Sequence, residues 1–218
     1  MARLFFFVDG FNLYHALDHF AGAGDHHRYH QYKWLSLTSL AKCFLRRHDA
    51  LAGIEYFTTL ATWDASKVAK HRSFIRAQEN EGVVVVYGKF KRKDRRCPKC
   101  GALSATVEEK QTDVNIAIRL LQGALHDSYD RAVIVSGDTD LLPAIGAVHA
   151  TFPGKQVGVV IPIGRSSEDM RKQADFHLRM RERHLGASIL PDPLTLADGT
   201  VLHCPPSWKP KPVTANGA

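Results

Sequence analysis

The segment Leu4-Phe5-Phe6-Phe7-Val8-Asp9-Gly10 decides the fold, because five consecutive apolar residues stop abruptly at an acid and a glycine. A short, continuous apolar run of this kind is typical of a parallel strand that is buried on both faces. Asn12 follows at a position where it could cap a helix running from Leu13 towards Phe20. The chain is therefore expected to open with a strand, an acidic turn and a helix.

Further apolar runs along the chain have the length and composition of strands, and helical periodicity separates them. The expected strands cover residues 54–59, 83–87, 132–135 and 156–161. The expected helices cover residues 34–47, 65–81, 111–125, 141–150 and 168–174. Strands that alternate with helices predict an α/β fold of three layers, in which helices cover both faces of a parallel sheet.

The domain organisation follows from the same pattern, since no internal repeat and no second core are evident. We expect one domain over residues 1–190, interrupted by a small cysteine-containing insertion at 93–108. Prolines become frequent from Pro191 onwards, which indicates a Pro-rich C-terminal extension over residues 191–218. The stretch from Pro205 to Ala218 is expected to be a loosely held tail.

Composition limits the classes of protein to which the chain can belong. The 218 residues are 44% hydrophobic and carry a formal charge of +7, which fits a globular protein with a polyanionic partner and excludes disorder. The first apolar run is too short for a signal peptide, and no run reaches membrane-spanning length. The four cysteines are expected to be reduced thiols or metal ligands. We therefore expect a cytoplasmic protein without a membrane partner.

Acidic residues follow two of the expected strands at the same edge of the sheet. Asp9 ends the first strand, and Asp138 and Asp140 follow the strand at 132–135. Sites in open parallel sheets form beyond the carboxyl ends of the strands. If these two strands are neighbours, three carboxylates meet in one crevice, and Asp113 could join them from the first turn of the preceding helix. Four like charges favour a bound cation, and Mg²⁺ or Mn²⁺ prefers such oxygen ligands.

Each acid also has a simpler interpretation. Asp9-Gly10 could form only a turn, and Asp113 could only place a negative charge at the N-terminus of a helix. Ser136-Gly137-Asp138 could be a loop that caps the next helix. The joint placement of all these residues at one expected sheet edge favours the metal site over four independent structural roles.

Three segments resemble the signature of the NYN family, which comprises PIN-like ribonuclease domains and includes the LabA-like bacterial group. They are Val8-Asp9-Gly10-Phe11-Asn12-Leu13, Glu109-Lys110-Gln111-Thr112-Asp113-Val114 and Val135-Ser136-Gly137-Asp138-Thr139-Asp140. The resemblance covers roughly the first 175 residues, with the motifs in the family's order.

The resemblance implies a Rossmann-like fold of the PIN type, with Mg²⁺ or Mn²⁺ bound by Asp9, Asp113, Asp138 and Asp140. It also implies in-line hydrolysis of RNA by a metal-activated water. Asn12 and Ser136 occupy positions at which they would orient a carboxylate or a phosphate. Many members of the family have no established substrate, so the resemblance indicates the chemistry better than the biological role.

The pair Cys97-Pro98-Lys99-Cys100 has the spacing of a zinc knuckle, in which two thiolates bind one ion. A tetrahedral zinc site needs two more ligands. Candidates are the pairs His203-Cys204 and His26-His27, or the same two cysteines from a second copy in a homodimer. Two thiols without a metal, in an exposed hairpin, are the alternative.

A basic strip precedes this pair and consists of Lys89, Lys91, Arg92, Lys93, Arg95 and Arg96. A run of charges is usually only a solvated face. Here the run extends the third strand past the sheet, and Tyr87 and Phe90 add aromatic faces. Basic groups beside aromatic rings suit single-stranded nucleic acid. We therefore expect Lys89, Lys91, Arg92 and Lys93 to contact RNA.

The leading hypothesis is a metal-dependent endoribonuclease that acts on RNA, and rival functions stay open. An RNA-binding module with a silent acidic site is less favoured, because all four aspartates are intact. A PIN-like nuclease that acts on DNA is a live alternative, because carboxylate-held metals do not recognise the 2′-hydroxyl. A phosphatase with an aspartyl nucleophile would need Asp-x-Asp after the first strand, where Asp9 is followed instead by Gly10 and Phe11.

Overall fold

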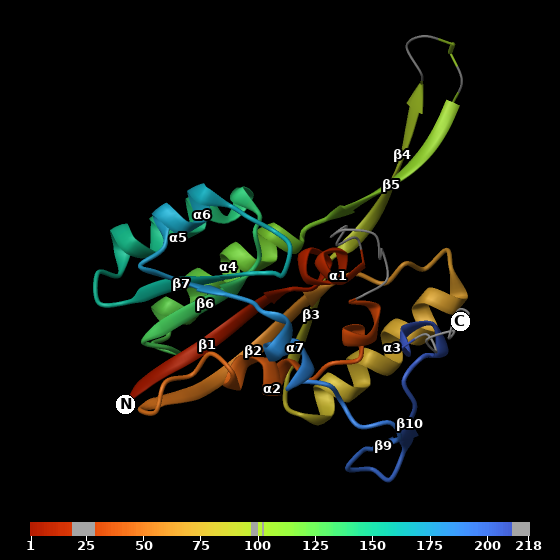
Figure 1. Cartoon of the computed structure of the whole chain (residues 1–218). Helices are drawn as coiled ribbons and strands as arrows, with labels where there is room; N and C mark the ends of the chain where they lie inside the picture. Colours follow the sequence, from red (N-terminus) through yellow and green to blue (C-terminus); the bar gives the residue numbers. More distant parts are fainter. Residues whose placement is uncertain (19–28, 97–99, 102, 211–218) are drawn as a thin grey trace, which may run out of the picture.

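The computed structural model describes residues 1–18, 29–96, 100–101 and 103–210 (Figure 1). Within these residues, six strands form one sheet in the order β3-β2-β1-β6-β7-β8, and every neighbouring pair is parallel. The strands are β1 (Ala2–Asp9), β2 (Asp49–Thr58), β3 (Val84–Tyr87), β6 (Arg131–Val135), β7 (Gln156–Ile161) and β8 (Phe176–Arg179). The predicted parallel sheet is confirmed.

Helices cover both faces of this sheet (Figure 1). One face carries α1 (Gly10–Asp18), α2 (Leu37–Lys42), α3 (Ala65–Asn80) and α7 (Glu182–Gly186). The other face carries α4 (Thr112–Leu125), α5 (Leu142–Thr151) and α6 (Glu168–Gln173). The predicted three-layer α/β architecture is therefore also confirmed.

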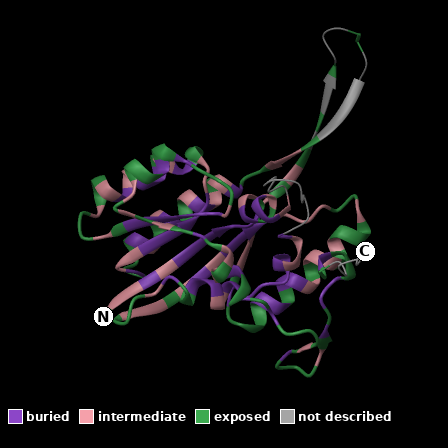
Figure 2. Cartoon of the chain, in the orientation of Figure 1, coloured by how far each residue is buried: buried purple, intermediate pink, exposed green. Residues whose placement is uncertain are grey.

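The apolar run of β1 explains why helices are needed on both faces. Successive side chains of a strand point to opposite faces, so Phe6 packs in one core cluster and Phe7 in the other. Both rings are almost completely buried, and Figure 2 shows the central strands as the most buried part of the molecule. A strand in which polar and apolar residues alternated would have one polar face, and so could not pack against a core on both sides.

Some boundaries differ from the sequence-based expectation. The helix expected at 34–47 is only α2, preceded by a short 3-10 helix, η1 (His30–Lys33). Ser36 caps α2 by accepting a bond from the Ser39 amide at 2.8 Å, and Leu35 forms an isolated antiparallel bridge with Ile189. Trp34 and Leu35 are buried without being helical, which is why their apolar character suggested a longer helix.

The insertion is an antiparallel hairpin of β4 (Lys89–Arg96) and β5 (Leu103–Lys110) that projects from the body (Figure 1). It is longer than the range 93–108 expected from the sequence, and the basic run does extend past the sheet. Gly88 joins β3 to this arm. A Cβ at this position would lie 2.7 Å from the hydroxyl oxygens of both Thr59 and Thr112. Only glycine therefore allows these two side chains to lie so close to the backbone of residue 88.

The C-terminal residues are more firmly packed than the expected loose tail. Strands β9 (Leu194–Thr195) and β10 (Val201–Leu202) precede a 3-10 helix, η3 (Pro206–Trp208). The Trp208 ring is buried against Phe74 of α3, with 6.3 Å between ring centroids. The described part of the extension therefore packs on the same core as the sheet, while residues 211–218 lie outside the described residues. Among the described residues, none of the helices has the length and apolar character to cross a bilayer.

Candidate functional site

The strand order brings together the two acidic strand ends. Strands β1 and β6 are parallel neighbours, with Val8 in register with Val135. Asp9 and Ser136 follow these partners directly, so the motifs lie at the same carboxyl edge of the sheet. The site predicted from the sequence required these two strands to be adjacent, and they are.

Asp9 is the most deeply placed of these acids, with only 4% of its surface exposed. Its carboxylate accepts a hydrogen bond from the Ser136 hydroxyl at 2.8 Å and another from the backbone amide of Asn12 at 2.9 Å. Burial raises the pKa of Asp9 to about 6, although these two bonds oppose the rise. The charges of Asp113 and Asp138 raise this pKa further.

Asn12 does not cap α1, which begins two residues earlier at Gly10. Its side-chain oxygen instead accepts a bond from the Gly137 amide at 3.1 Å, across to the loop after β6. The start of α1 lies very close to β2, since a Cβ on Gly10 would lie 2.6 Å from the Phe57 carbonyl oxygen. Asn12 therefore ties the first helix to the acidic loop.

The loop after β6 is fixed by its own side chains. The Ser136 hydroxyl accepts a bond from the Asp138 amide at 3.1 Å. The Asp138 carboxylate accepts one from the Asp140 amide at 3.0 Å, at the start of a 3-10 helix, η2 (Thr139–Leu141). The capping role considered for this loop is therefore real. One oxygen of Asp138 is engaged in the cap, and Asp140 is exposed to solvent.

Asp113 lies in the first turn of α4 and is half-buried. Its pKa is raised, first by burial and then by the charges of Asp138 and Asp140. Gln111 precedes this helix with a φ of 79°, a left-handed conformation that is uncommon for residues other than glycine. This sharp turn brings the chain from β5 directly into α4, and so places Asp113 beside the acids of β1 and β6.

Glu109, the penultimate residue of β5, is a fifth acid, and its place in a sequence motif did not by itself indicate a role. It is half-buried and accepts a bond from the Thr59 hydroxyl at 3.1 Å. Burial raises its pKa to about 7, and the charges of Asp9 and Asp113 add to the rise. The hairpin therefore contributes a carboxylate to the same acidic edge as the four aspartates.

The donor chemistry of this edge fits a hard divalent cation. Carboxylate oxygens are the ligands that Mg²⁺ and Mn²⁺ prefer, and mutual repulsion among the acids would be relieved by a cation. The acids are not preassembled, however. Among the described residues, no three acidic, histidine or cysteine side chains are grouped closely enough to bind an ion together. The aspartates lie at one edge of the sheet without converging on a single point.

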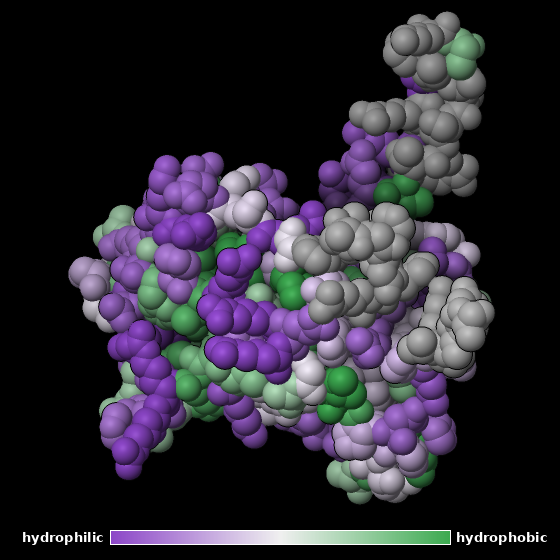
Figure 3. All heavy atoms as spheres, in the orientation of Figure 1, coloured by the Kyte–Doolittle hydropathy of each residue, from purple (hydrophilic) through white to green (hydrophobic). Residues whose placement is uncertain are grey.

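The basic strip is divided between two faces of the hairpin. Directly opposed residues of an antiparallel pair share a face, and Phe90 is opposed to Glu109, whereas Lys91 is opposed to Glu108. The side chains of Lys89, Lys91 and Lys93 thus lie on the face away from Glu109. Lys93 forms an ion pair of 3.4 Å with Glu108. Figure 3 shows hydrophilic side chains along the described part of this arm. The side chain of Arg92 lies outside the described residues.

Cys100 lies between β4 and β5, at the far end of the arm. Cys100 is exposed and is not part of a disulfide, and Cys97 lies outside the described residues, as do His26 and His27. His203 and Cys204 follow β10, which lies far from the tip of the arm in Figure 1. Cys204 is buried, with its amide bonded to Asp192. These two residues are therefore not suitable ligands for a zinc ion at the tip.

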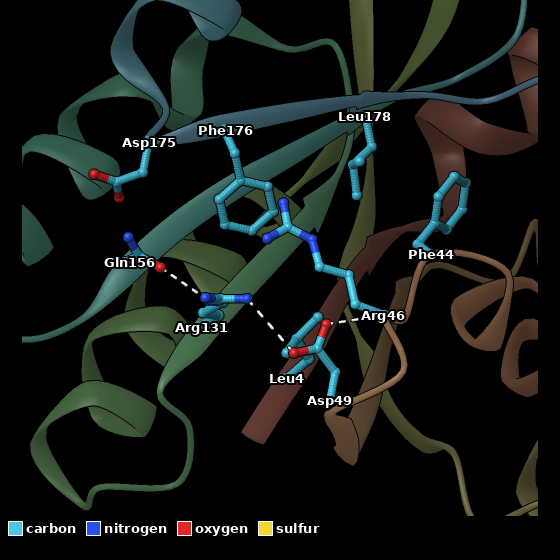
Figure 4. Close-up of a pocket in the computed structure, with 9 residues that line it drawn as sticks. All are labelled: Leu4, Phe44, Arg46, Asp49, Arg131, Gln156, Asp175, Phe176 and Leu178. Atoms are coloured by element: carbon cyan, nitrogen blue, oxygen red, sulfur yellow. Dashed lines mark hydrogen bonds and ion pairs between the residues drawn. The ribbon is translucent and has the colours of Figure 1, made fainter. Parts of the chain in front are cut away.

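A separate hollow of about 220 Å³ lies at the opposite, amino-terminal edge of the sheet (Figure 4). Its charged groups largely neutralise one another: Arg131 lies 3.5 Å from Asp49 and donates to Gln156 at 2.8 Å. Asp175 accepts a bond from the Val157 amide at 2.7 Å. None of the predicted site residues lines this hollow, so the acidic edge stays the candidate functional site.

The parallel sheet, its two helical layers and the acids beyond its carboxyl edge define an α/β protein with a PIN-like, nuclease-type fold. The NYN domain model matches residues 3–180, and the chain belongs to the NYN family.

The proteins that are similar to this chain include a curated protein and a protein of known structure. A curated protein of Pseudomonas putida, 6-hydroxy-3-succinoylpyridine 3-monooxygenase HspA, is 30% identical over 98 residues. The match spans 44% of this chain and 31% of that protein, less than a third of its length. A crystal structure of a Vibrio parahaemolyticus protein of unknown function has a TM-score of 0.55 at 17% identity, covering 87% of this chain and 96% of that one. The latter likeness shows a shared fold.

Proposed function

We propose that this protein is a divalent-metal-dependent endoribonuclease, which hydrolyses phosphodiester bonds of RNA by in-line attack of water. The observation that carries the proposal is the buried carboxylate of Asp9 among Asp113, Asp138 and Glu109, with the pKa of Asp9 raised to about 6. Acids held close together at the cost of mutual repulsion are typical of a site that binds a cation. Membership of a family with a nuclease-type fold supports the same conclusion.

The residues of the site would have different roles. Asp9, Asp113, Asp138 and Asp140 would hold Mg²⁺ or Mn²⁺, with Glu109 as an additional carboxylate at the arm side. Such a cation, when bound, lowers the pKa of a water and neutralises charge on the phosphodiester. Ser136 and Asn12 would hold Asp9 and the acidic loop in place, through bonds of 2.8 and 3.1 Å.

RNA is the favoured substrate because the aromatic residues at the base of the arm suit an unpaired strand, and the lysines on the other face of the arm add positive charge nearby. The chain has a net charge of +7, and its exposed lysines would attract any polyanion. DNA stays the alternative substrate, since the acids themselves do not distinguish the two sugars. The pyridine monooxygenase is similar over 98 residues only, less than a third of its length, so its reaction is not proposed for this chain.

The test is to incubate the protein with labelled single-stranded RNA and with DNA of the same sequence, in Mg²⁺, in Mn²⁺ and in EDTA. Cleavage of RNA in either metal, lost in EDTA, supports the proposal. Cleavage of DNA alone would establish the alternative nuclease. Tight RNA binding without cleavage in either metal would identify a silent RNA-binding module instead.

A further inference from the structure

Trp63 stands out among the aromatic side chains because more than half of its surface is exposed. It lies between β2 and α3, and its exposed fraction is 54%. The other two tryptophans, Trp34 and Trp208, are 1% and 8% exposed and belong to the core. A large exposed ring beside a candidate site is a common mark of ligand contact.

The indole is held in place by the arm. Its ring centroid lies 4.7 Å from that of Phe90 in β4, and the two planes meet at 76°. In this edge-to-face arrangement the two rings contact each other without being stacked, so a further ring can stack on the exposed indole. The pair Trp63–Phe90, here called the aromatic platform, is therefore fixed but open to solvent.

The platform lies next to Glu109, the acid that the arm contributes to the carboxyl edge of the sheet. Phe90 is directly opposed to Glu109 in the hairpin, so the two side chains share a face. Glu109 in turn accepts a bond from Thr59, four residues before Trp63, at 3.1 Å. The charges of Asp9 and Asp113 are close enough to contribute to the raised pKa of Glu109, after the larger effect of burial. A strand of nucleic acid whose phosphate lies at the acids would thus have a neighbouring base at the platform.

We propose that the aromatic platform is a subsite that stacks one unpaired nucleobase next to the bond to be cut. The inference rests on the proposed function and deepens it. Stacking on aromatic faces accepts every base and requires that the base be unpaired. The subsite would therefore make the protein prefer single-stranded over double-stranded RNA, without adding a strong preference for sequence.

A purely structural role for Trp63, as a contact that holds the arm, makes a different prediction for two variants. Trp63→Phe keeps an aromatic ring, whereas Trp63→Leu keeps an apolar contact with Phe90 and loses the stacking face. If the platform stacks a base, Trp63→Leu weakens RNA binding roughly ten-fold and Trp63→Phe has a much smaller effect. If both variants bind as tightly as the wild type, the platform is not a base subsite.

Fluorescence supplies the decisive measurement, since Trp34 and Trp208 are buried. Short oligouridylate, added in EDTA so that no cleavage occurs, should quench the emission of the wild type but not that of Trp63→Phe. An oligonucleotide of equal length and charge with abasic sugars should bind without this quenching. Equal quenching by both probes would overturn the proposal.

These binding assays are independent of cleavage. Normal quenching in a protein that cuts no RNA would refute the proposed function and leave the subsite standing. Normal metal-dependent cleavage with no effect of Trp63→Leu on binding or on the apparent KM would refute the subsite alone.

Discussion

The hydroxyl of Ser136 donates a hydrogen bond of 2.8 Å to the carboxylate of Asp9 and so joins the ends of two neighbouring strands. Both groups are buried, and Asp9 has no comparable second donor on that oxygen among the described residues. Because this bond lowers the pKa of Asp9 against the effect of burial, its loss leaves a buried charge less well compensated.

Ser136→Ala should therefore destabilise the metal-free protein by about 1–3 kcal/mol at neutral pH, the cost of an unsatisfied buried acceptor. The pKa of Asp9 should rise above its value of about 6. Urea unfolding measured at several pH values tests both statements. Unchanged stability at pH 7 would mean that water replaces the hydroxyl.

Asp138→Asn and Asp140→Asn should each lower the rate of RNA cleavage at least about 100-fold, since a cation contributes several kcal/mol to such reactions. The fold should survive, because asparagine keeps the oxygen with which Asp138 accepts the bond from Asp140. The matched control is Asp169→Asn, at an exposed acid of α6, which should cut normally. Wild-type rates in the site variants would refute the assignment of these acids as metal ligands.

Glu109→Gln should weaken the apparent affinity for Mg²⁺ or Mn²⁺, because one of the carboxylates at the acidic edge is replaced by a neutral amide. Glutamine still accepts the bond from Thr59, so the base of the arm should keep its place. Glu108→Gln is a close control, since Glu108 lies on the other face and pairs with Lys93 and Lys110. Metal titrations followed by cleavage rate compare the two variants. If Glu109→Gln and Glu108→Gln change the apparent metal affinity equally, Glu109 has no specific role in metal binding.

The same variant tests the pH dependence of stability without metal. The folded-state pKa values of Asp9 and Glu109 are raised, to about 6 and about 7, from ordinary values of 3.8 and 4.5. Groups shifted in this direction contribute stability that is fully present at low pH and is lost as pH rises through the folded pKa. The contribution of Glu109 should thus disappear between about pH 4.5 and 7, and Glu109→Gln should show a shallower decline than the wild type.

Replacing Lys89, Lys91 and Lys93 together by glutamine should reduce the salt dependence of RNA binding. Each lost phosphate contact lowers the slope of log K against log salt by about 0.7 for a single strand, hence by about 2 if all three lysines contact RNA. The cleavage rate at saturating RNA should be unchanged. A control with Lys42, Arg47 and Lys172 replaced has the same net charge. If the salt dependence of RNA binding has the same slope in the two triple variants, binding responds only to net charge and not to the lysines of the arm.

Protein purified without chelator should contain zinc if Cys97 and Cys100 form half of a tetrahedral site. A site shared by two copies predicts about one zinc for two chains, and a site completed within the chain predicts about one for each. Cys100→Ser should remove the metal, while Cys43→Ser, another exposed free thiol, should retain it. Elemental analysis that finds no zinc in the wild type would refute the zinc knuckle.

Much of the fold could be predicted because its signals are local. The sequence alone shows the uninterrupted apolar run of β1 and the acids at the ends of β1 and β6. A parallel sheet topology then places those acids at one edge of the sheet. Strand β8 could not be predicted from the sequence, because its burial alternates and it carries His177 and Arg179, so it contains no apolar run. Its place in the sheet comes from pairing with β7.

The residues that sequence reasoning missed or misplaced depend on long-range pairing. Glu109 joins the site only because β5 returns antiparallel to β4 and ends beside Thr59. The division of the lysines between two faces follows from the hairpin register. Trp63 gains its position from contact with Phe90, twenty-seven residues further along the chain. No periodicity within a short window carries this information.

The arm leaves the body at Gly88 and returns at Gln111, both at the edge where the acids lie. Residues can therefore be inserted or deleted at its tip without shifting any strand of the sheet. Evolution can in this way vary the length and charge of the arm while the acids stay under separate constraint. Among related proteins, we expect divergence in the choice of target to accumulate in this appendage, with the reaction itself left unaltered.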